Sequence, residues 1–246
     1  MNFIRYRQKY LSTCLVATAA LIGGVSSASA QVPLGAAAPF TVLGGTAVTC
    51  TGGAVVGEVG ISPGITASYT NTGCAVKGSA PPATNAVAVE AREDFLSAYA
   101  ALETEATNRA CTQVDGSLAA QNLAPGVYCT DAVAKTGVLT LNGPSTGVWI
   151  FLVDGALTGT NFTVVMAGGG QPCNVYWTPS AAATFTTSTV NGTILAGDVT
   201  GGSITLTGGT LAGRALANVA VTTTGTSLTS CQLASASAPL AQGHND

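Results

Sequence analysis

The sequence predicts a mostly β protein: a parallel β-solenoid with one long α-helix packed alongside it. Short runs of β-branched and aromatic residues alternate with Gly, Asn, Asp or Pro corners through most of the chain. From residue 148 onward these runs recur as an irregular repeat of about 17 to 26 residues, the length of one solenoid coil. A single stretch has helical periodicity instead.

Residues 1–30 have the features of a secretory signal peptide. Three basic side chains precede an apolar stretch at 11–25, and a small-residue cleavage site follows before Gln31. The apolar stretch is shorter than the roughly 20 residues of a membrane-spanning helix. We therefore expect a secreted, extracellular protein with a single domain at 31–231 and a disordered tail at 232–246.

The helical stretch is residues 84–110. Its apolar side chains recur at spacings of three and four, at Ala88, Ala91, Phe95, Tyr99, Leu102 and Ala106. Most of its acidic side chains lie off that stripe, so an amphipathic helix is expected to cover an apolar surface. Two prolines precede it, with Thr84 or Asn85 as the expected N-cap.

Each repeat unit after residue 148 begins with an apolar run and continues with a threonine-bearing run. The apolar runs start at Val148, Val175, Ile194 and Ala215. Because side chains in a strand alternate between faces, the second runs have an inward set and an outward set. The inward set is Leu157, Phe185, Ile204, Leu206 and Val221. The outward pairs are Thr158 and Thr160, Thr184 and Thr186, Thr205 and Thr207, and Thr222 and Thr224.

A third column is expected after a bend in each of these runs. Its members are Thr163, Thr189, Thr210 and Ser227. Near the N-terminus, Thr46 and Thr49 have the spacing that separates the second and third columns, and they are predicted to add another rung. Stacked rungs lie about 4.8 Å apart, and alternate residues of one strand lie about 6.7 Å apart. The sequence therefore predicts a two-dimensional grid of hydroxyl and methyl groups.

The chemistry of this grid favours contact with ordered water. The β-branch of threonine stiffens χ1, so the positions of the groups are largely set before any ligand arrives. Hydroxyls anchor water molecules, whereas charged groups would impose their own hydration geometry. A purely structural role is the alternative, because threonine has a high strand propensity and suits the outer side of an exposed sheet.

Composition and charge exclude several classes of partner. Charged residues make up 8% of the chain, about a third of the usual share. Without the leader, five basic residues face eleven acidic ones, and no basic cluster exists. We therefore expect no nucleic-acid or membrane partner. The sequence contains no P-loop or Rossmann motif, so no cofactor is expected. We also expect the protein to be a monomer.

The cysteines predict disulfides. Six remain after the leader: Cys50, Cys74, Cys111, Cys129, Cys173 and Cys231. An even number in an exported chain indicates three bridges, although six cysteines allow fifteen pairings. Pairing in sequence order is the simplest arrangement. A zinc site is disfavoured because the chain has no CxxC motif.

Several segments resemble the secreted microbial ice-binding (antifreeze) proteins. They are FTVLG at 40–44, GEVGISPG at 57–64, LAPGVYC at 123–129, VWIF at 148–151, CNVYW at 173–177, NGTILA at 191–196 and GRALA at 213–217. The resemblance implies a right-handed solenoid of roughly triangular section, with a cap at about 62–83. It also implies that the N-terminal coil packs beside the last coils, out of sequence order.

The resemblance further implies the function and the site. Such a protein adsorbs to ice through a flat threonine-rich face and inhibits ice growth and recrystallisation. Segments of the Thr-x-x-Thr type mark the face, here Thr160 and Thr163, Thr186 and Thr189, Thr207 and Thr210, Thr46 and Thr49, and Thr224 and Ser227. Two departures are the serine at 227 and the Asn161–Phe162 pair, which is expected to place an aromatic ring on the face.

The sequence leaves two alternative functions, of which the first is enzymatic. A polysaccharide-cleaving enzyme would need two carboxylates roughly 5 to 9.5 Å apart in a cleft. Asp154 and Asp198 are the candidates, with Arg214 one unit further on, but corner positions explain these acids better. The only histidine is His244, so no enzyme activity is expected.

The second alternative is a cell-surface or matrix module that binds carbohydrate. Asn161 and Asn191 lie in glycosylation sequons. A glycan on Asn161 would obstruct the predicted face and would favour this alternative.

Overall fold

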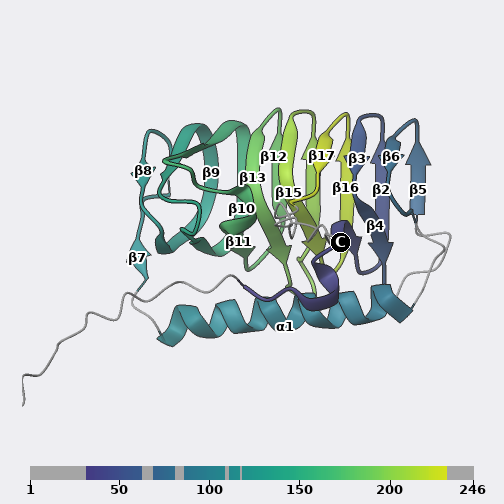
Figure 1. The fold of residues 1–246 in the computed structure, drawn as a ribbon, viewed down its shortest axis with the longest axis horizontal. Helices are drawn as coiled ribbons and strands as arrows, with labels where there is room; N and C mark the ends of the chain where they lie inside the picture. The colour runs from purple at the N-terminus through teal and green to yellow at the C-terminus, as the bar shows by residue number, and fades with distance from the viewer. Residues whose placement is uncertain (1–31, 63–68, 81–85, 109–110, 117, 232–246) are drawn as a thin grey trace, which may run out of the picture.

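The computed structural model describes residues 32–62, 69–80, 86–108, 111–116 and 118–231. These residues form one β-solenoid, and α1 (Ala86–Asn108) lies along its side (Figure 1). This architecture confirms the predicted fold class. The predicted leader and the predicted tail lie outside the described residues.

Within the described ranges, seventeen strands pair in parallel as one curled sheet, which corners divide into three faces. The helix face consists of β1 (Phe40–Gly44), β4 (Glu58–Ile61), β11 (Val175–Pro179), the first residues of β9 (Gly126–Asn142) and β10 (Trp149–Ala167), and the last residues of β13 (Thr189–Ala196) and β15 (Thr210–Ala217). The threonine face consists of β2 (Ala47–Thr51), β5 (Tyr69–Thr72), β12 (Ala183–Thr186), β14 (Ile204–Thr207), β16 (Ala220–Thr224) and the middle residues of β9 and β10.

The third face completes each coil. It consists of β3 (Ala54–Val56), β6 (Ala75–Lys77), β17 (Ser227–Thr229), the first residues of β13 and β15, and the last residues of β9 and β10. At one end, β7 (Thr112–Gln113) and β8 (Asn122–Leu123) pair with β9. The described residues also include two short 3-10 helices, η1 (Gly35–Ala37) and η3 (Pro172–Asn174).

The coils do not stack in sequence order. The C-terminal coil of β15, β16 and β17 pairs with the N-terminal strands β1, β2 and β3, which appear side by side in yellow and purple in Figure 1. Ala215 lies opposite Val42, and Val221 lies opposite Val48. The out-of-order packing that the resemblance implied is therefore confirmed.

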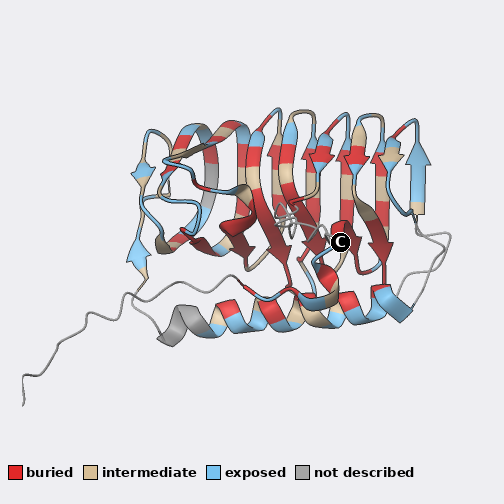
Figure 2. Ribbon diagram, in the orientation of Figure 1, coloured by how far each residue is buried: buried red, intermediate tan, exposed pale blue. Residues whose placement is uncertain are grey.

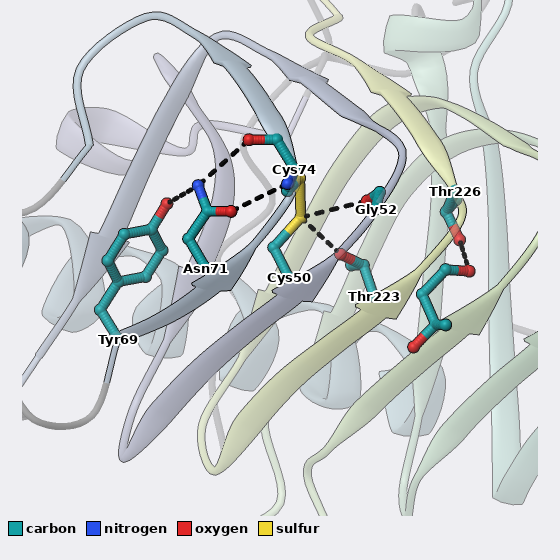
Figure 3. The surroundings of a disulfide bond; sticks show 8 residues. Cys50, Gly52, Tyr69, Asn71, Cys74, Thr223 and Thr226 are labelled. Carbon is teal, nitrogen blue, oxygen red and sulfur yellow. Dashed lines mark hydrogen bonds between the residues drawn. A yellow bond between two sulfur atoms is a disulfide. The ribbon is translucent and has the colours of Figure 1, made fainter.

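The predicted cap at 62–83 contains β5 and β6, which form a last, partial coil on β2 and β3. Residues 63–68 and 81–85 of this region lie outside the described residues. A disulfide between Cys50 and Cys74 attaches the partial coil to β2 (Figure 3). Asn71 closes the corner, because its Oδ1 accepts from the Cys74 N–H at 2.9 Å and its Nδ2 donates to the Cys74 carbonyl at 3.1 Å.

The six cysteines pair in sequence order. The bridges are Cys50–Cys74, Cys111–Cys129 and Cys173–Cys231. The second joins the segment after α1 to β9, and the third joins η3 to the end of the last coil. The sequence predicted three bridges and offered this pairing only as the simplest of fifteen.

Buried residues recur along the strands of the solenoid (Figure 2). Large apolar side chains fill its interior. Trp149, Phe151 and Trp177 are fully buried. The rings of Phe151 and Trp177 stack with their centroids 4.1 Å apart, and Tyr128 stacks on Phe151 at 5.4 Å. Both indole N–H groups donate to backbone carbonyl oxygens at 3.0 Å, so these polar groups are satisfied inside the core.

The helix covers the outer side of the helix face and forms a second core. Its buried residues are Ala88, Ala91, Phe95, Ala98 and Leu102. They pack with Leu43, Ile150, Tyr176, Leu195 and Leu216 from the sheet. Asp94 attaches the helix to η1, because its Oδ2 accepts from the Ala36 N–H at 2.7 Å. The expected N-caps Thr84 and Asn85 lie outside the described residues. Among the described residues, no helix is both long and apolar enough to cross a membrane.

Two charged side chains are buried in the described part of the chain. Arg214 holds three segments together: its Nε donates to the Ala38 carbonyl at 2.7 Å, and its Nη2 donates to the Cys231 carbonyl at 2.8 Å. Lys135 lies opposite Gly159, whose neighbour on the next coil is the inward-facing Phe185. The lysine therefore belongs to an interior column of the threonine face, at the end near β7 and β8.

Candidate functional site: a grid of threonines

The threonine face carries two complete columns of threonine. Strand pairing places six in the first column: Thr158, Thr184, Thr205, Thr222, Thr49 and Thr70. It places six in the second column: Thr160, Thr186, Thr207, Thr224, Thr51 and Thr72. None of these strand pairs has a register shift, so the columns are unbroken across six strands.

Local strand geometry produces this arrangement. Leu157, Phe185, Ile204, Leu206 and Val221 alternate with the threonines and are all buried, as predicted. Their packing in the interior fixes which side of each strand faces outward. With a spacing of about 4.8 Å between strands, six rungs extend over about 24 Å.

The grid is neutral, and its hydroxyls are available to a ligand. No charged residue occurs in β2, β5, β12, β14, β16 or at 157–160. Within the described residues, none of the twelve hydroxyls bonds to another protein group. Buried threonines behave differently: Thr41 and Thr178 donate to backbone carbonyls at 3.0 and 3.1 Å. The grid hydroxyls are thus left to bind water.

The predicted third column lies beyond a corner. Thr163, Thr189, Thr210 and Ser227 are in register with one another, at the start of the third face. The column then continues with Ala54 and Ala75, which have no hydroxyl. The sequence-predicted residues are therefore divided between two faces, and only the first two columns form a continuous hydroxyl array.

Thr46 is not brought into any column. It precedes β2, and its hydroxyl donates to the Val219 carbonyl at 2.9 Å. Thr49 does lie in the grid, but in the first column, opposite Thr222, and not in the third column that its spacing from Thr46 predicted. The second-column residue of that rung is Thr51, two residues on, rather than the predicted Thr46 three residues back.

Three grid residues were missed by the sequence reasoning: Thr51, Thr70 and Thr72. The signal that identifies them is Thr-x-Thr spacing, because residues two apart share a strand face. Thr49 and Thr51 have this spacing, and so do Thr70 and Thr72.

The prediction that Phe162 places an aromatic ring on the threonine face is wrong. Phe162 is fully buried, and its ring stacks with that of Phe185 at a centroid distance of 6.5 Å. The cause is Asn161, which has a left-handed backbone with φ of 50° and turns the chain at the corner. Asn161 itself is exposed beside the second column.

The acids considered for catalysis have other surroundings. Asp198 caps its own turn, because its carboxylate accepts hydrogen bonds from the Thr200 N–H and hydroxyl, both at 2.8 Å. The pKa of this carboxyl is lowered, mainly by the hydrogen bond from the Gly201 N–H. Asp154 lines a cavity of about 410 Å³ that Asp198 does not reach. Burial and then the charge of Asp154 raise the pKa of Glu103, which lines the same cavity. Arg214 is committed to the structural hydrogen bonds described above.

No metal centre or free thiol accompanies these acids in the part of the chain that the structure describes. No group of three or more His, Cys, Asp or Glu side chains there is arranged to hold a metal ion. Cys129 lines the cavity but is bonded to Cys111.

Solved ice-binding proteins share this architecture. An ice-binding protein from an Antarctic Biological Consortium superposes with a TM-score of 0.71 at 29% identity, over 81% of this chain and 91% of that chain. One from the ascomycete Antarctomyces psychrotrophicus gives a TM-score of 0.72 at 26% identity, over 83% and 100% of the two chains. The fold is therefore that of the ice-binding β-solenoids.

Sequence comparison assigns the chain within that class. The sequence profile described as Ice-binding-like matches residues 42–229. Ice-binding protein K3-B1 of Typhula ishikariensis is 30% identical over 207 residues, which is 75% of this chain and 85% of the relative. An ice-binding protein of Nostoc sp. (strain HG1) is 36% identical over 66% of this chain and 61% of its own length. The chain belongs to the Ice-binding-like family.

Proposed function

We propose that this protein adsorbs to ice through the threonine face and thereby inhibits ice growth and recrystallisation. The observation that carries the proposal is the two-column grid: twelve threonines in register, uncharged, whose hydroxyls make no hydrogen bond to the described part of the protein. Family membership supports it.

The physical basis is the fixed spacing of the grid. The hydroxyls hold water molecules at intervals set by the strands, and the methyl groups between them bind water weakly. Waters on such a surface keep most of their bonds to one another, so their order merges with that of a crystal. Because the strands and the β-branched side chains are rigid, little conformational entropy is lost on adsorption.

A central substitution tests the face. In Thr207→Tyr, a ring stands above the grid between Thr186 and Thr224 and holds the neighbouring threonines away from ice. The concentration needed to inhibit recrystallisation should rise about tenfold or more, which corresponds to a loss of about 1.4 kcal/mol or more in adsorption. The thermal midpoint should change little, because Thr207 is exposed.

The control is Ser97→Tyr, which places the same ring on the exposed side of α1. It should retain full activity. Equal inhibition by the Thr207 variant and the wild type would reject the assignment of the face, and loss of activity in the Ser97 variant would place binding elsewhere. Wild-type protein that leaves ice growth unchanged and is excluded from a growing ice front would reject the function itself.

The third column is proposed to contact ice only at the margin, because it lies beyond the corner. Thr210→Tyr should therefore weaken recrystallisation inhibition less than Thr207→Tyr does. A larger loss in the Thr210 variant would show that the third face is the principal surface.

We also infer that the protein is secreted and acts as a monomer. Three disulfides support export to an oxidising compartment. Sequencing the N-terminus of protein from the medium of producing cells should give Gln31, and a start at Met1 would contradict cleavage. Sedimentation should give the mass of a single chain.

A further inference from the structure

The corner after the second column has an unusual backbone in every rung. The residue that follows each second-column threonine has positive φ: Asn161 at 50°, Thr187 at 49°, Gly208 at 63°, Gly225 at 62°, Gly52 at 62° and Gly73 at 71°. This left-handed conformation turns the chain from the threonine face to the third face. We call these six residues the ridge.

Thr187 is the exception in the ridge. Glycine adopts left-handed backbone without steric cost, and asparagine tolerates it. A β-branched residue with this φ is an outlier that is strained relative to glycine. Four of the six positions hold glycine, so the corner does not need a threonine in order to turn.

The surroundings of Thr187 provide no internal reason for its side chain. It is exposed, and among the described residues its hydroxyl has no protein partner. Ser188, the next residue, shows what a structural hydroxyl does here: it is buried, donates to the Thr186 carbonyl at 2.9 Å and accepts from the Phe162 N–H at 3.1 Å.

Space on the ridge favours a role toward a ligand. A Cβ built on Gly208 would lie 3.8 Å from Oγ1 of Thr187, with no nearer atom, so the neighbouring rung leaves the Thr187 side chain uncovered. The residue also directly follows Thr186 of the second column and lies two residues before Thr189 of the third.

We propose that Thr187 is a further ice-contacting residue, which extends the hydroxyl and methyl array from the threonine face onto the ridge. Its strained backbone is retained because of what the side chain binds at the surface. This inference rests on the proposed function of the threonine face, and it adds a residue outside both columns.

Thr187→Gly tests the inference directly. It introduces the residue found at most ridge positions, so the thermal midpoint should equal or exceed that of the wild type. Activity should fall: the concentration that inhibits recrystallisation should rise severalfold, and less protein should partition into ice. A gain of stability together with a loss of activity is not expected for a residue whose role is structural.

A second variant adds the group elsewhere on the ridge. A Cβ on Gly225 would meet no atom within 4 Å, so the Cβ of Gly225→Thr has space, and its left-handed backbone carries the same strain as that of Thr187. In the Thr187→Gly background it should recover part of the lost activity, and Gly225→Ala, which adds no hydroxyl, should recover less.

The outcomes separate this inference from the proposed function. If Thr187→Gly retains full activity while Thr207→Tyr is inactive, Thr187 has no role at the ice surface and the threonine face keeps its role. If Thr187→Gly lowers the thermal midpoint, the side chain is structural and the inference is wrong. If Thr207→Tyr is also fully active, the proposed face and this inference fail together.

Discussion

Replacing Lys135 should make the protein more stable, and the gain should depend on pH. Only 2% of Lys135 is exposed, and its Nζ has no hydrogen-bond partner among the described residues. Burial lowers the pKa of this amine from 10.5 to about 8, and attraction to Asp115 opposes that effect. At neutral pH the folded chain therefore holds a charge that the interior disfavours.

The magnitude follows from the pKa. Because a tenfold change in proton affinity is worth about 1.4 kcal/mol, lowering the pKa of Lys135 from 10.5 to about 8 destabilises the folded chain by about 3 kcal/mol at pH 7. Lys135→Met keeps a similar side-chain length without the charge. It should raise the free energy of unfolding at pH 7 by about 2 to 3 kcal/mol.

The pH dependence distinguishes this cause from better packing. Below about pH 8 the amine is protonated in both the folded and the unfolded chain, so the penalty is constant. Between about 8 and 10.5 the folded chain has released the proton and the unfolded chain still holds it, so wild-type stability rises with pH. The advantage of the methionine variant should shrink over the same range.

Urea unfolding between pH 7 and 9.5 provides the measurement, followed by fluorescence of the buried Trp149 and Trp177. Tyr99 does not ionise in this range, because its pKa is raised to about 12, first by burial and then by the charge of Glu103. Lys77→Met, at an exposed site on β6, is the control and should change stability by less than about 0.5 kcal/mol. An advantage of Lys135→Met that is constant across the range, or a loss of stability at pH 7, would refute the reasoning.

Three further predictions concern the framework of the grid. Phe95→Ala, which empties a fully buried position between α1 and the sheet, should lower the free energy of unfolding by about 3 to 5 kcal/mol in urea titration, and a loss below 1 kcal/mol would contradict the packing. Gly209→Ala should lower the thermal midpoint of the protein more than Gly225→Ala does. Both residues have positive φ, but only a Cβ at Gly209 would clash with the backbone, at 2.1 Å from the carbonyl oxygen of Ser188. Unfolded, unreduced protein that starts at Gln31 should show no free thiol with Ellman's reagent, and a stoichiometric signal would disprove the three bridges.

Features with a local period could be predicted from the sequence. The helix at Ala86–Asn108 lies within the predicted 84–110 because its apolar residues recur with the helical period. Leu157 and Thr158 face opposite sides because neighbours in a strand always do. That rule correctly placed eight of the twelve grid threonines in their columns. Thr49, whose spacing from Thr46 had suggested the third column, lies in the first column instead.

Features that depend on corners and on stacking were missed. The left-handed residue Asn161 interrupts the alternation, so Phe162 turns inward although counting along a straight strand places it on the face. Lys135 was not expected in the interior because charged side chains usually remain in water. Its position is set instead by register with Gly159 on the neighbouring coil.

The amino-acid sequence alone determined that this chain forms a threonine-bearing solenoid with a flanking helix, because hydrophobic periodicity and strand alternation act over a few residues. Only the tertiary structure decided the extent of the grid. Thr51, Thr70 and Thr72 become its last members because β2 stacks on β16 and β5 stacks on β2. The contact between β2 and β16 joins residues about 170 positions apart in the sequence. It depends on how complete coils pack against each other, and a local sequence pattern does not contain that information.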